Sequence, residues 1–156
     1  MKTICAVTDG IEILIDDQDF DRVNAHRWYV NRKRKYVLTS INEKTVFLHR
    51  FILGLTPGDG IEIDHRNRMP SDCQRSNMRI CTRAENLANR RIWTGRFRGA
   101  YPNGNGWQAQ IKINGKLKYL GYFKTEEEAA KRYNEEAIKV HGEFAYLNEF
   151  EETVGV

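Results

Sequence analysis

The stretch 61–65, together with Asn77 and Asn86 downstream, limits most strongly what this chain can fold into. Within that stretch isoleucines alternate with acidic residues, a period of two that is typical of a short strand with one buried face. Such a strand delivers a carboxylate, Asp64, and an imidazole, His65, side by side at its end. The two asparagines follow at spacings that a loop and a second short strand can fill.

A helix start comes next. Thr82 and Glu85 have the spacing of a capping box, which predicts a helix that begins at Arg83 and runs to Arg91. Asn86 would then lie early in this helix. Each residue alone has an ordinary structural explanation, because Asp-His pairs, turn-capping asparagines and solvated helical asparagines are common. Only the combination at these spacings makes a functional interpretation the better one.

Strand, loop, short strand and helix in this order is the outline of a ββα-metal nuclease site. The residues Asp64-His65, Asn77 and Asn86, with flanking text around Leu48-His49-Arg50, resemble the HNH endonuclease family, specifically its phage and intron homing branch. The resemblance covers roughly residues 45–92. It implies phosphodiester hydrolysis in nucleic acid.

The chemistry of that reaction gives each residue type a reason. Hydrolysis needs an activated water, and a histidine that titrates near neutral pH can take its proton, so we expect His65 to be the general base. A hard divalent cation prefers oxygen ligands, which Asp64 and Asn86 offer. We expect magnesium, with manganese as the alternative. The resemblance implies that Asn77 orients the imidazole and that His49 is catalytic, although His49 could instead be a packed residue at a helix start.

Charge is concentrated around this motif. The chain of 156 residues has a net charge of +4, yet nine arginines lie between Arg66 and Arg98, opposed only by Asp72 and Glu85. Such a concentration is typical of a polyanion-binding surface. A solubilising surface is the alternative, but such a surface usually mixes charges of both signs. The expected contacts to DNA from this lobe are Arg66, Arg68, Arg75, Arg83 and Arg90.

Cysteine usage argues against a structural zinc site, because Cys5, Cys73 and Cys81 include no CxxC pair. Three free thiols suit a reducing cytoplasm. No run has the length of a transmembrane helix, so we expect a cytoplasmic protein of a bacterial or phage-infected cell with no membrane partner.

A second unit is predicted after a linker at residues 93–96. Trp107 to Ile113 alternate cleanly, Asn114-Gly115 predicts a tight hairpin, and Thr125 with Glu128 forms another capping box before a helix that stops at Gly142. We therefore expect three antiparallel strands and one helix.

Residues 97–150 resemble the plant Apetala-two, or ethylene-response-factor, DNA-binding domain. The matching text includes Phe97-Arg98-Gly99, Trp107-Gln-Ala-Gln-Ile111, Tyr119-Leu-Gly-Tyr-Phe123 and Tyr146-Leu-Asn148. The resemblance implies that one sheet face enters the DNA major groove through Arg98, Gln110, Lys112 and Tyr119. Tyr119 stands where that family has a tryptophan, so its base preference does not transfer.

The sequence as a whole predicts an α+β fold. A ββα-metal nuclease lobe within residues 1–92 is followed by a small three-stranded sheet with one helix at 97–150. The predicted function is a metal-dependent homing-type DNA endonuclease that acts on duplex DNA as a monomer and nicks one strand. A non-enzymatic DNA-binding regulator with a degenerate motif and an RNA-directed nuclease are the alternatives.

Overall fold

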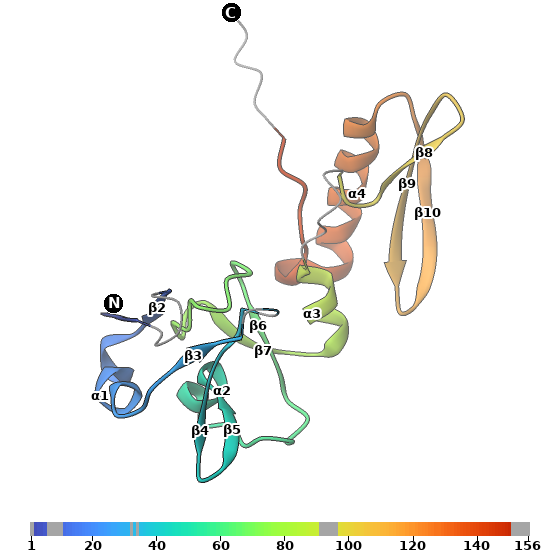
Figure 1. Cartoon of the computed structure of the whole chain (residues 1–156). Coiled ribbons are helices and arrows are strands. Elements are labelled where there is room, and N and C mark those ends of the chain that lie inside the picture. Colours follow the sequence, from blue (N-terminus) through green and yellow to red (C-terminus); the bar gives the residue numbers. More distant parts are fainter. Residues whose placement is uncertain (1, 6–10, 32, 34, 91–96, 151–156) are drawn as a thin grey trace, which may run out of the picture. The chain divides into compact units, whose positions relative to one another are not determined.

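The structure is a computed structural model that describes residues 2–5, 11–31, 33, 35–90 and 97–150 (Figure 1). The chain divides into two compact units, residues 1–86 and 87–156. The expected linker, residues 93–96, lies outside the described residues, and the expected domain limits of 1–92 and 97–150 stay a prediction. No helix in the described ranges is both long enough and apolar enough to cross a bilayer.

The first unit is built from small antiparallel sheets and short helices. Strands β1 and β2 pair with each other, and a separate sheet has the order β3-β4-β5. The elements up to the nuclease motif are β1 (Lys2–Cys5), β2 (Glu12–Ile15), η1 (Asp17–Asp19), α1 (Phe20–Asn24), β3 (Tyr29–Val30), β4 (Val37–Ile41), β5 (Lys44–Phe47) and α2 (Leu48–Leu53).

One hydrophobic core serves this whole unit. Ile13 and Trp28 from the N-terminal region are buried in the same cluster as Ile63 and Met78 from the motif. Burial of such side chains is the main favourable term in folding. The expectation that the N-terminal region packs against the motif is therefore confirmed.

The motif itself folds as a hairpin followed by a helix. Strands β6 (Glu62–His65) and β7 (Met78–Cys81) pair antiparallel, and α3 (Arg83–Asn89) follows. The backbone N–H of Thr82 donates to Glu85 Oε2 at 2.7 Å, and the N–H of Glu85 donates to Thr82 Oγ1 at 3.3 Å, so the capping box starts the helix as predicted. The helix ends at Asn89, two residues before the expected end.

The second unit is a three-stranded antiparallel sheet with one long helix, as predicted. The sheet order is β10-β9-β8, and α4 contacts all three strands. The Asn114-Gly115 turn has φ angles of 49° and 83°, which is the tight hairpin that the sequence predicts. The elements are β8 (Ala100–Asn103), β9 (Gly106–Ile113), β10 (Lys116–Phe123), α4 (Glu126–His141) and η2 (Gly142–Phe144).

Small residues let this helix approach the sheet closely. The buried core contains Ala109 from β9 and Ala129, Ala130 and Ala137 from α4. The first strand of this sheet begins at Ala100, directly after Gly99, which has a φ of 78°. A Cβ at Gly99 would collide with the ring of Tyr133, so the position requires glycine. The structure is thus a mixed fold of helices and small antiparallel sheets.

Candidate active site

Asp64 on β6 lies in a buried ion pair. Arg79 is its direct partner on β7, and the guanidinium donates from Nε at 2.8 Å and from Nη2 at 2.6 Å to Asp64 Oδ2. Asp64 is 5% exposed and Arg79 8% exposed. The sequence predicted one buried face for this strand, but the second face is also covered, because Arg79 lies against the carboxylate.

His65 ends β6 and lies among aromatic rings. Its ring centroid is 5.4 Å from that of His49 on α2, at an interplanar angle of 88°, and 6.3 Å from that of Tyr36. Phe47 stacks on His49 at 5.6 Å. Because neighbouring side chains of a strand point to opposite faces, Asp64 and His65 leave β6 towards different partners. The structure thus brings His49 and His65 together.

Burial sets the charge of both imidazoles. It lowers the pKa of His49 to about 3, with smaller contributions from the positive charges of His65 and Arg50. It also lowers the pKa of His65 below the usual 6.5, against the opposing effect of the Asp64 and Asp72 carboxylates. A lowered pKa keeps an imidazole neutral at pH 7, and only the neutral ring has a lone pair that accepts a proton.

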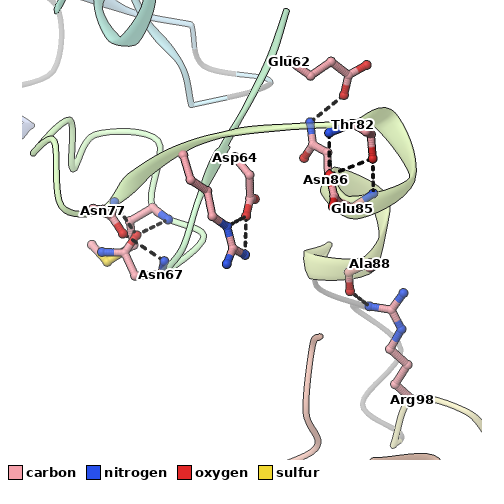
Figure 2. Close-up of polar contacts among 11 residues, drawn as sticks. Glu62, Asp64, Asn67, Asn77, Thr82, Glu85, Asn86, Ala88 and Arg98 are labelled. Carbon is pink, nitrogen blue, oxygen red and sulfur yellow. Dashed lines mark hydrogen bonds and ion pairs between the residues drawn. The ribbon is translucent and has the colours of Figure 1, made fainter. Parts of the chain in front are cut away.

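Asn77 holds the loop that leaves the strand. Its Nδ2 donates to Asn67 Oδ1 at 3.0 Å, and its Oδ1 accepts from the Asn67 backbone N–H at 3.0 Å (Figure 2). The same Nδ2 donates to the Asp72 carbonyl at 2.8 Å. The backbone N–H of Arg66, directly after His65, donates to the Asn77 carbonyl at 2.8 Å. Asn77 therefore fixes the chain immediately after the imidazole, and its expected role in orienting the ring itself stays a prediction.

Glu62 ties α3 to β6. Its Oε2 accepts from Asn86 Nδ2 at 2.9 Å (Figure 2). Its Oε1 accepts from Arg83 Nη1 at 3.0 Å. These hydrogen bonds to Asn86 and Arg83 lower the pKa of the Glu62 carboxyl, so it is ionised at neutral pH. Glu62 and Asp64 are two residues apart on one strand and share a face. Asn86 is consequently held at the face that carries Asp64.

The side chains fit a hard divalent cation at this face. Because the Asn86 nitrogen is engaged by Glu62, the carboxamide oxygen is the atom left for a cation. Asp64 brings a carboxylate, whose oxygens are ligands of the kind that a hard cation prefers. One carboxylate and one amide oxygen are the donor types that magnesium takes. Within the described residues, no three or more His, Cys, Asp or Glu side chains are grouped as metal ligands.

Arg75, expected to contact DNA, is engaged inside the first unit. Its Nε and Nη2 each donate to the Asp19 carboxylate at 2.8 Å, and Nη2 also donates to the Ile52 carbonyl at 2.8 Å. Such a bidentate pair with a buried carboxylate joins η1 to the loop after β6. Arg75 therefore no longer belongs to our proposed DNA contacts.

The remaining candidates of this lobe face solvent. The side chain of Arg83 is 79% exposed although it reaches Glu62, so it remains accessible to a phosphate. The other exposed arginines of the set are Arg66, Arg68 and Arg90. Their contact with DNA stays a prediction.

Arg98 likewise has a different partner from the expected one. Its Nη1 donates to the carbonyl of Ala88 at 2.6 Å (Figure 2). Nη1 also donates to the carbonyl of Arg90 at 3.0 Å, and Nη2 donates to that of Leu87 at 3.2 Å. The guanidinium also lies 5.6 Å from the ring centroid of Tyr146. Arg98 thus binds the C-terminal end of α3, and we remove it from the DNA-contacting set.

The outer face of the second sheet keeps the other three predicted contacts together. Tyr119 lies directly opposite Gln110 in the β9–β10 register, and Lys112 lies opposite Leu117. Lys112 and Tyr119 are exposed and Gln110 is partly exposed. Ala109 and Ile111, which alternate with Gln110 and Lys112 along β9, are buried. The predicted alternation is confirmed. Whether this face binds DNA, and the resemblance to the Apetala-two fold, stay predictions.

Residues 46–88 match the HNH endonuclease family. The matched range runs from β5 to α3. It contains the four candidate site residues of the β6–β7 hairpin and α3, which are Asp64, His65, Asn77 and Asn86. A protein of Acanthamoeba polyphaga mimivirus, described as an uncharacterized HNH endonuclease, is 28% identical over 134 residues, which is 83% of this chain and 70% of the relative. No solved structure matches this chain. These similarities support nuclease activity as a class.

Two side chains at the site are not singled out by the sequence patterns above. Arg79 is one of many arginines in its region, and Glu62 is one member of an alternating pattern. The signal for Arg79 is the hairpin register, which places it opposite Asp64, and the signal for Glu62 is its position two residues before Asp64.

Proposed function

We propose that this protein is a metal-dependent endonuclease that hydrolyses a phosphodiester bond in duplex DNA. The observation that carries the proposal is the arrangement around β6. A buried imidazole and a carboxylate leave the end of one strand, and Glu62 holds a carboxamide from α3 at the carboxylate's face. This arrangement lies within the range that matches HNH endonucleases.

His65 would act as the general base. Burial lowers its pKa, so the ring is neutral at pH 7 and accepts the proton of the attacking water. His49 packs edge-on against this ring and stays neutral as well, so it adds no competing charge. Asn77 fixes the loop after His65, which restricts the position of the base.

Asp64 and Asn86 would hold a divalent cation, magnesium or manganese, through one oxygen each. When bound, such an ion supplies positive charge that stabilises the phosphoryl oxygens as negative charge builds on them. Glu62 orients the amide oxygen by engaging the amide nitrogen. Arg79 balances the Asp64 carboxylate and keeps it in position before an ion arrives.

Arginine side chains would bind the phosphates of the DNA, and the second unit would recognise its base sequence. Arg66, Arg68, Arg83 and Arg90 offer exposed cations that suit phosphates, which position a duplex without reading it. The outer face of β9 and β10 offers Gln110, Lys112 and Tyr119 to base edges. The chain has one Asp-His-Asn-Asn set, so a monomer of the homing type would nick one strand.

Supercoiled plasmids with random inserts test this function. With Mg²⁺ or Mn²⁺ we expect open circles to accumulate well before linear DNA, and a chelator should stop the conversion. Binding of the plasmids without conversion would contradict the proposal and support a non-enzymatic DNA-binding regulator. Linear product that appears directly, with second-order dependence on protein, would contradict the monomeric nicking.

A further inference from the structure

The last turn of a helix leaves carbonyl groups without partners inside the helix. The guanidinium of Arg98 satisfies two such carbonyls of α3, those of Leu87 and Ala88, and also the carbonyl of Arg90 directly after the helix. The backbone N–H of Tyr146 also donates to Ala88 O, at 3.3 Å. A cation at the negative end of the helix dipole is favourable, so these contacts stabilise the end of α3.

Arg98 is itself held firmly by the second unit. Its N–H donates to Asn148 Oδ1 at 2.6 Å, and its carbonyl accepts from Asn148 Nδ2 at 2.9 Å. Asn148 is in turn bonded to Asn134 on α4, where two hydrogen bonds measure 2.9 Å each. The guanidinium therefore extends from an anchored backbone rather than from a mobile loop.

The same helix carries Asn86, the proposed metal ligand. The division between the two units falls between Asn86 and Leu87, so α3 belongs to both. Its first half is tied to β6 through Glu62, and its last turn is tied to Arg98. A helix of seven residues has little stability of its own, so contacts at its ends decide whether it stays formed.

We propose that Arg98 is a positioning residue for the nuclease site: by binding the C-terminal carbonyls of α3 it keeps the Asn86 carboxamide in place. This inference rests on the proposed function for Asn86, but not on any contact of Arg98 with DNA.

The test compares Arg98→Met, which keeps the aliphatic stem and removes every donor, with Arg98→Lys, which keeps a cation and one bond. Arg132→Met is the matched control, because Arg132 pairs with Glu136 on the same helix, α4. Four quantities are measured on the full chain. They are the amide hydrogen exchange of residues 86–90, the affinity for Mn²⁺, the nicking rate at saturating plasmid, and the Kd for that plasmid in the presence of chelator.

For Arg98→Met we expect faster exchange in α3 and Mn²⁺ affinity lowered roughly 10–100-fold, as is typical when a supporting contact to a ligand is lost. The nicking rate at saturation should fall by a similar factor, while the Kd for DNA changes less than about twofold. Arg98→Lys should lie between wild type and Arg98→Met. If Arg98→Met does not fold, the inference is tested by Arg98→Lys alone, which should show a smaller loss of Mn²⁺ affinity and of protection from exchange in α3.

Unchanged α3 exchange and Mn²⁺ affinity would overturn the inference, whatever the nicking assay shows. A raised Kd for DNA with an unaltered α3 would overturn it too, because Arg98 would then be a DNA contact. If wild type binds Mn²⁺ through an Arg98-dependent site but nicks nothing, the positioning role stands and the proposed nuclease function fails.

Discussion

At the scale of single residues, the Asp64–Arg79 pair has two consequences. A carboxylate that is 5% exposed is costly unless a partner balances its charge, and Arg79 supplies that charge across the β6–β7 hairpin. A divalent cation bound to the same carboxylate would supply the charge instead. Stability and metal binding should therefore be linked at this position.

We predict that Arg79→Met lowers the free energy of unfolding by about 3–5 kcal/mol in chelator, the usual cost of leaving a buried charge alone. Mn²⁺ should restore part of that loss, since the ion takes over the balance of charge. Urea unfolding of the first unit measures both effects. Arg83→Met is the control, because a pair with an exposed arginine contributes only about 0–1 kcal/mol. If Mn²⁺ does not restore any of the lost free energy of unfolding, Asp64 is not a ligand of the metal.

At the scale of elements, local signals set most of what the sequence predicts. Both capping boxes, at Thr82 and Thr125, and the Asn114-Gly115 turn depend on residues close in the chain, and all three form as predicted. Arg75 and Arg98 could not be assigned in this way. Arg75 pairs with Asp19, 56 residues away, and Arg98 binds carbonyls that lie 8 to 11 residues away, and these contacts form only in the folded chain.

The contact between α4 and β10 gives a pH-dependent prediction. Glu136 on α4 accepts from Lys118 Nζ at 2.7 Å and from Arg132 Nη2 at 3.1 Å. Hydrogen bonds to Lys118 and then Arg132 lower the pKa of Glu136 below its ordinary 4.5. A carboxyl with a depressed folded-state pKa stabilises the fold fully above its ordinary pKa, and this stabilisation is lost as the pH falls through the depressed value.

Glu136→Gln should consequently destabilise the second unit at pH 7, and the difference from wild type should shrink below about pH 4.5. Urea midpoints followed by the amide signals of β9 and β10 measure it. Glu135→Gln is the control, because its side chain is 65% exposed and exposed substitutions cost less than about 0.5 kcal/mol. A constant difference at every pH would mean that packing, not charge, explains the loss.

At the scale of the whole molecule, the helix α3 runs across the boundary between the two units, with Asn86 in the first unit and Leu87 and Ala88 in the second. The sequence predicts a nuclease lobe and a binding lobe with a linker between them, and these domain limits stay a prediction. The candidate site residues follow from local spacing in the sequence, and their roles stay predictions as well. The contacts of Arg98 with the end of α3 do not follow from local spacing, because they form only in the folded chain.

The central claim is that His65 is the base of a metal-dependent DNA nicking reaction. The most direct test is the single-turnover nicking rate of His65→Ala with Mg²⁺ at saturating plasmid, with His26→Gln as the matched histidine control. We expect His65→Ala to nick on the order of 10²–10⁴-fold more slowly, with its Kd for DNA nearly unchanged, and His26→Gln to keep the wild-type rate. Equal nicking by wild type and His65→Ala would contradict the account.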